Sequence, residues 1–134
     1  MRPPLMLGQR ATLERVFTPD DLRAYAALTA RVAPAAPPSE ATVPEPLIGA
    51  LFSCLLGTAL PGRGTNYLKQ RLTFHAPARV GERLTATVEI VRLRPEKALV
   101  NLRTTCLGDG GRLICEGEAL VLAKDVPGAF VTSM

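Results

Sequence analysis

The sequence predicts an α+β fold in which a long antiparallel sheet wraps around one buried helix. Residues 47–59 are apolar on nearly every face, which is typical of a helix that is buried on all sides. Residues 82–93 alternate between apolar and polar side chains, which indicates a strand with one dry face. The run from Gly108 to Gly111 joins two further strand-like segments and is a strong hairpin signal.

Two shorter elements precede the central helix. Residues 8–17 alternate approximately and predict a first strand. Thr18 then predicts a helix start as its cap, Pro19 suits the first helical position, and the aspartates that follow complement the positive helix end. A core-facing stripe comes next at helical spacing, formed by Leu22, Tyr25, Ala26 and Thr29.

Residues 31–46 are rich in proline and predict an extended loop. After the central helix we expect long antiparallel strands over residues 66–75, 82–93, 98–107 and 112–124. The hot-dog architecture has this order of elements: a strand, a helix, a loop, a buried helix and four strands.

Two strands carry further information. In the first of the four long strands we expect Leu68, Leu72 and Phe74 to face the helix, and His75 to face away from it. In the last strand both faces become apolar near Leu120 and Leu122, which predicts an extra layer there, such as a subunit interface.

Composition predicts one cytoplasmic domain over residues 1–134. The net charge is +4, but no basic cluster is interleaved with aromatic residues, so we expect no nucleic-acid partner. Cys54, Cys106 and Cys115 each lie in an apolar run and are interpreted as reduced core thiols. The longest apolar stretch, residues 47–60, is too short for a membrane span, the proline-broken start does not fit a signal peptide, and no metal site is predicted.

Residues 51–64, LFSCLLGTALPGRG, resemble the buried helix and following turn of the MaoC-like (R)-specific enoyl-CoA hydratases. Residues 72–82 are similar to that family's "lrFxxPvxvGD" stretch, and residues 117–119 to its "GeA". The resemblance implies a homodimeric hot-dog protein that adds water to trans-2-enoyl thioesters of coenzyme A or acyl carrier protein. It implies no cofactor beyond the CoA or phosphopantetheine thioester itself, and an Asp/His pair for acid–base catalysis.

The residues that would form this pair are missing. The family's segment "S-G-D-x-N-P-x-H" matches residues 29–36, where Arg31 replaces the Asp and Ala36 the His. A guanidinium stays charged and cannot act as a base. The loop that follows is shortened, and Glu45 takes the place of the glycine whose N–H would polarise the thioester carbonyl.

Two functions therefore remain open. A divergent hydratase would use another base, for which the weak candidates are Glu40 and Glu45. A non-catalytic subunit would only bind the acyl thioester, or complete a heterodimer with a catalytic hot-dog subunit; the missing pair favours this interpretation. For both, we expect the acyl thioester to contact Arg31, Ser53, Gly57, Leu60, Pro61, Gly62, Arg63 and Gly64.

Overall fold

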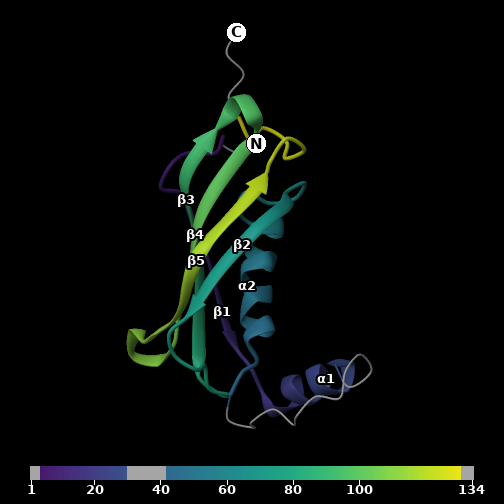
Figure 1. Cartoon of the computed structure of the whole chain (residues 1–134), viewed down its shortest axis with the longest axis vertical. Helices are drawn as coiled ribbons and strands as arrows, with labels where there is room; N and C mark the ends of the chain where they lie inside the picture. The colour runs from purple at the N-terminus through teal and green to yellow at the C-terminus, as the bar shows by residue number, and fades with distance from the viewer. Residues whose placement is uncertain (1–3, 30–41, 131–134) are drawn as a thin grey trace.

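The computed structural model describes residues 4–29 and 42–130 of the chain, in the arrangement of Figure 1. A sheet curls along one long helix, and a shorter helix lies at the end of the molecule where the long helix begins. In chain order the elements are β1 (Arg10–Val16), α1 (Pro19–Thr29), α2 (Glu45–Thr58), β2 (Asn66–Phe74), β3 (Arg83–Arg94), η1 (Pro95–Lys97), β4 (Leu99–Leu107), η2 (Asp109–Gly111) and β5 (Leu113–Leu122).

The described strands form one five-stranded antiparallel sheet in the order β1-β3-β4-β5-β2. Strands β3, β4 and β5 follow one another through tight turns and pair over most of their length. The central helix α2 packs against one face of this sheet (Figure 1). The predicted hot-dog architecture, an antiparallel sheet around a central helix, is confirmed.

The core lies between α2 and the inner face of the sheet. On β3 the alternating positions Leu84, Ala86, Val88 and Ile90 are all buried, as their period of two predicts. From α2, Phe52 and its buried neighbours fill the concave side of the sheet. Full burial of one such aliphatic or aromatic side chain stabilises the fold by about 1.5–3 kcal/mol.

The first helix begins as predicted. The Asp21 amide donates to Thr18 Oγ1 (3.2 Å), and the Thr18 amide donates to Asp21 Oδ2 (2.8 Å). This reciprocal pair is a capping box, which satisfies two backbone donors at the helix start. Together with the Thr18 hydroxyl, it holds the pKa of the Asp21 carboxyl below its ordinary value. Leu22, the first residue of the predicted stripe, is buried.

The start of α2 differs from the expectation. The sequence predicts Glu45 and Pro46 in the proline-rich loop, but they form the first turn of α2, with Pro44 at its N-cap. Proline is well suited to this turn because its missing N–H has no partner to lose there. Of the predicted loop, residues 31–41 lie outside the described part of the chain.

One face of α2 is exposed, so the expectation of a helix buried on all sides is wrong. The helix lies on a single sheet, and within residues 4–29 and 42–130 nothing covers its other side. Cys54 lies on this exposed side, which corrects its assignment to the core, whereas Cys106 and Cys115 are buried. The exposed positions of α2 after its first turn carry small side chains: Ala50, Ser53, Cys54, Gly57 and Thr58.

Strand β2 contains an irregularity that reverses one predicted orientation. The pairing of β2 with β5 shifts between Tyr67 and Lys69, so Leu68 is left out of the ladder and is 53% exposed. Gln70 takes an inward position opposite the buried Ala119. Leu72 and Phe74 face the core as predicted because they follow the irregularity. In β5, Leu120 and Leu122 are half-buried, and the extra layer over them stays a prediction.

Candidate functional site

A cavity of about 310 Å³ lies where α2 begins and β2 ends. One wall comes from the start of α2 and the segment before it, and the opposite wall comes from the end of β2 and the segment after it. The first wall is formed by Thr42, Val43, Glu45 and Ile48, and the second by Phe74, His75, Ala76, Pro77 and Ala78.

Backbone pairing joins the two walls. The Val43 amide donates to the Ala78 carbonyl oxygen at 2.8 Å, and Thr42 forms an isolated antiparallel bridge with Arg79. Val43 and Ala78 are both buried, so solvent does not compete for this hydrogen bond. The position of the α2 start therefore depends on where residues 76–79 lie.

Among the described residues that line this cavity, Glu45 is the only one with a carboxylate. It lies in the first turn of α2, where the positive end of the helix dipole favours a negative charge. Within the described chain no hydrogen bond or ion pair engages its carboxylate. Burial, then the Cys106 thiol, then the Glu45 charge together raise the pKa of Cys115 to about 12.

The amides beside Glu45 are few. Pro46 has no N–H, and the Leu47 amide donates to the Pro44 carbonyl oxygen at 3.0 Å. The first turn of α2 thus offers a ligand carbonyl fewer donors than an ordinary helix start.

His75 borders the cavity, but its imidazole is not directed at Glu45. Its Nε2 atom lies 3.8 Å from Glu116 Oε1, on the face of the sheet away from α2, and both side chains are exposed. The predicted orientation of His75 is therefore correct.

The other residues predicted to bind the thioester lie away from this cavity. Ser53 is in the middle of α2, and residues 57–64 are at its far end, roughly 20 Å from Glu45 at the rise of an α-helix. Arg31 and Glu40 lie outside the described residues. Among the described residues, the structure groups Glu45 with Thr42, Val43, Ile48 and residues 74–78, while Ser53 and residues 57–64 lie elsewhere on α2 and after its end.

Residues 60–64 have a structural role as the end of α2. Leu60, Pro61 and Gly62 are buried, whereas Arg63 is exposed. A Cβ atom on Gly64 would lie 2.3 Å from the Asp125 carbonyl oxygen, and its φ of +101° also favours glycine. Their predicted contact with the thioester stays a prediction.

A chain of polar side chains crosses from α2 to the sheet. The Ser53 hydroxyl is hydrogen-bonded to Tyr67, the Tyr67 hydroxyl donates to Gln70 Oε1, and Gln70 Nε2 donates to the buried Thr104 hydroxyl at 3.3 Å. Burial raises the pKa of Tyr67, and the Ser53 hydroxyl opposes this effect. The sequence did not reveal this row of polar side chains. Tyr67 and Gln70 both face inward only because of the irregularity in pairing at Leu68.

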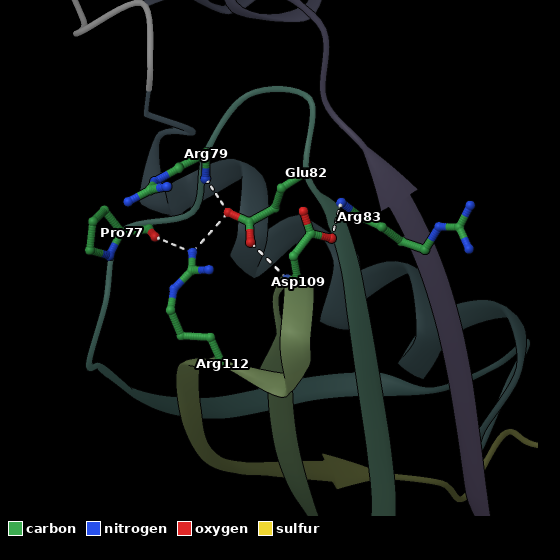
Figure 2. Close-up of polar contacts among 6 residues, drawn as sticks. All are labelled: Pro77, Arg79, Glu82, Arg83, Asp109 and Arg112. Atoms are coloured by element: carbon green, nitrogen blue, oxygen red, sulfur yellow. Dashed lines mark hydrogen bonds and ion pairs between the residues drawn. The ribbon is translucent and has the colours of Figure 1, made fainter.

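A buried carboxylate next to the cavity was also missed. Glu82 is only 6% exposed, and its carboxylate accepts hydrogen bonds from the Arg79 amide (2.6 Å), the Asp109 amide (2.8 Å) and Arg112 Nη2 (2.8 Å). Figure 2 shows it enclosed by the three donors. These bonds, with that from Arg112 the strongest influence, lower the pKa of Glu82 to about 2. We call this group of four residues the Glu82 clamp.

Two kinds of site are not found. In the described residues no three His, Cys, Asp or Glu side chains come together as metal ligands would. No described helix combines the length and the apolar character that crossing a membrane requires.

Comparison with known proteins finds relatives of similar sequence and structure. No family model matches the sequence. The chain is 40% identical over 126 residues to an "(R)-specific enoyl-CoA hydratase" of Aeromonas caviae, covering 87% of this chain and 94% of the relative. It is 37% identical over 124 residues to the protein of the same name from Rhodospirillum rubrum, covering 86% and 85%. A solved R-hydratase from Pseudomonas aeruginosa superimposes with a TM-score of 0.78 at 28% identity, over 97% of this chain and 92% of that one.

Proposed function

We propose that this chain, which belongs to the (R)-specific enoyl-CoA hydratase family, hydrates trans-2-enoyl thioesters of coenzyme A or an acyl carrier protein. The observation that carries the proposal is the cavity at the start of α2, which contains the Glu45 carboxylate, unpaired within residues 4–29 and 42–130. The 40% identity to a hydratase over most of both chains supports the same reaction class. The product would be the (R)-3-hydroxyacyl thioester.

The proposed base is Glu45, acting alone. Its carboxylate takes a proton from a water molecule as the water oxygen bonds to C3 of the enoyl group. The electron pair of the double bond moves towards the thioester carbonyl, and C2 then takes the proton from the Glu45 carboxyl. One water is added and the carboxylate is regenerated. The positive end of α2 would stabilise the negative charge on the carbonyl oxygen.

A second function is favoured by one specific observation. The resemblance drawn from the sequence aligns Arg31 and Ala36 with the Asp and the His of the family pattern. A chain without that pair would bind the acyl thioester without hydrating it, as a non-catalytic subunit of a homodimer or as the partner of a catalytic hot-dog subunit.

Assembly as a dimer belongs to the same proposal. Strand β2 is an edge of the described sheet, and Tyr67 and Leu68 are exposed on it. The exposed side of α2, with its small side chains, adds a second uncovered surface. Light scattering during size-exclusion chromatography should give a mass of about twice 14.3 kDa for the homodimer; a monomeric mass would contradict it.

The test is hydration of crotonyl-CoA, followed by the loss of enoyl thioester absorbance. We expect turnover by the native chain and a loss of roughly 10²-fold or more in Glu45→Gln, because this change removes the base and keeps the shape. Glu96→Gln, in the exposed turn η1, is the matched control and should keep full activity.

The other outcomes decide between the two functions. Turnover that survives in Glu45→Gln but disappears in Glu40→Gln would move the base to Glu40. Tight binding of crotonyl-CoA without turnover would establish the non-catalytic function. In that case the double variant Arg31→Asp, Ala36→His should also be inactive, because the shortened loop has lost the carbonyl-polarising glycine as well.

A further inference from the structure

The Glu82 clamp connects the turn between β4 and β5 to the segment that follows β2 (Figure 2). Asp109 and Arg112 belong to the turn, and Arg79 belongs to the segment. Arg112 Nη2 also donates to the Pro77 carbonyl oxygen at 3.0 Å. Two residues of this segment are therefore held by direct hydrogen bonds: Arg79 by its bond to Glu82, and Pro77 by its bond from Arg112.

The segment that is held in this way forms one wall of the cavity. Pro77 and Ala78 line the cavity directly. Ala78 lies between the two clamped residues, and its carbonyl oxygen accepts the 2.8 Å hydrogen bond from Val43. Only Pro44 separates Val43 from Glu45, so hydrogen bonds and short stretches of backbone together connect Glu82 to the first turn of α2.

The surroundings of Glu82 are shaped for its carboxylate. A Cβ atom on Gly108 would lie 2.2 Å from Glu82 Oε1, so a larger residue at position 108 would displace the Glu82 carboxylate. Asp109 also accepts a hydrogen bond from the Arg83 amide at 3.3 Å, which fixes the turn against the start of β3. The carboxylate therefore has one defined position.

We propose that Glu82 is a positioning residue for the thioester site: it holds residues 77–79, and through Val43 the start of α2, in the geometry that binds the substrate. The proposal rests on the proposed function, because it takes the cavity at the start of α2 as the thioester site. Glu82 itself does not touch the substrate. Releasing the wall should weaken substrate binding more than it slows the chemical step, because Glu45 and its helix are still present.

The test compares two variants of similar stability. Glu82→Gln keeps the shape of the side chain and removes the charge that Arg112 neutralises. Val100→Ala is the matched control: Val100 is fully buried and pairs with Val121 at the opposite end of the sheet. Both variants should unfold at a lower temperature than the native chain, and both are assayed well below their own Tm.

We expect the KM for crotonyl-CoA to rise ~10-fold or more in Glu82→Gln, which corresponds to a loss of about 1.4 kcal/mol of binding free energy, and kcat to change much less. Val100→Ala should keep the native KM. The Val43 amide should exchange with deuterium faster in Glu82→Gln and at the native rate in Val100→Ala. If Glu82→Gln folds too poorly, Arg112→Gln removes the bond to Pro77 and should show the same split more weakly.

Three results would overturn the inference. A native KM in Glu82→Gln despite a lower Tm would make the clamp structural only. An equal rise of KM in Val100→Ala would attribute the effect to general loss of stability. If the native chain binds crotonyl-CoA without turnover, only the hydratase function fails. In that case an unchanged Kd for crotonyl-CoA and an unchanged Val43 exchange rate in Glu82→Gln would refute the positioning role. If the native chain does not bind crotonyl-CoA at all, the hydratase function and the positioning role are both refuted.

Discussion

Acid should remove a defined part of the stability of this fold, and Glu82 determines where. The pKa of its carboxyl falls from 4.5 to about 2 in the folded chain, chiefly through the hydrogen bond from Arg112. A carboxyl whose pKa is lower in the folded than in the unfolded chain stabilises the fold fully when the pH is above its unfolded-state pKa. This stabilisation is lost as the pH falls through its folded-state pKa. The stabilisation is therefore complete above pH 5 and is lost between pH 4.5 and pH 2.

The magnitude follows from the same pKa values. At about 1.4 kcal/mol for each pH unit between them, Glu82 contributes up to about 3 kcal/mol. The carboxylate is almost wholly buried, so solvent screens it little, although Arg112 itself is partly exposed. This is a large share of the 5–15 kcal/mol that typically separates folded from unfolded domains.

The assay is urea unfolding of the native chain and of Glu82→Gln at pH 7, 4.5, 3 and 2. At pH 7 the variant should be less stable by about 2–3 kcal/mol, and the two curves should converge by pH 2. The comparison cancels the titration of all other groups. Glu116→Gln, which removes an exposed carboxylate, should stay within roughly 0.5 kcal/mol of the native chain. A difference between native chain and Glu82→Gln that is the same at pH 7 and at pH 2 would refute the reasoning.

Two further predictions concern packing and thiol reactivity. Gly117→Ala should cost more than ~3 kcal/mol of unfolding free energy, because the new Cβ would lie 1.8 Å from the backbone oxygen of Arg71. Gly57→Ala, whose Cβ would meet nothing within 4 Å, should be neutral or stabilising by up to ~1 kcal/mol. Urea unfolding that shows the same loss of unfolding free energy in Gly117→Ala and Gly57→Ala would contradict these two expectations. Iodoacetamide at pH 8 should label Cys54 first, because it is exposed, while burial raises the pKa of Cys106 to about 11 and protects it until urea is added. Mass spectrometry showing early label on Cys106 would contradict that burial.

The strands could be read from the sequence where one chain segment carries its own pattern. Leu84, Ala86 and Val88 reveal the dry face of β3 by their spacing alone. Leu68 could not be placed in the same way, because its orientation depends on a shift in pairing with β5. A one-residue irregularity in one strand reverses the face of each residue before it.

The candidate site shows the same limit. Glu45 could be named from the sequence because it stands close to the start of an apolar helix in a segment that the family resemblance had marked. Glu82 ends the stretch similar to "lrFxxPvxvGD", but the resemblance gives it no role. Its partner Arg112 is 30 residues away, and the turn that brings the two together is fixed only in the folded sheet.

The two glutamates at this end of the molecule differ in whether they can exchange a proton with a substrate. Glu82 is enclosed by three donors, whose hydrogen bonds occupy its carboxylate oxygens. Glu45 lines the cavity, and in the described chain no side chain or amide engages its carboxylate. A general base must be free to accept a proton and must reach the reacting water. Of these two carboxylates only Glu45 meets both conditions, and the rigidity of Glu82 keeps the cavity wall opposite it in place.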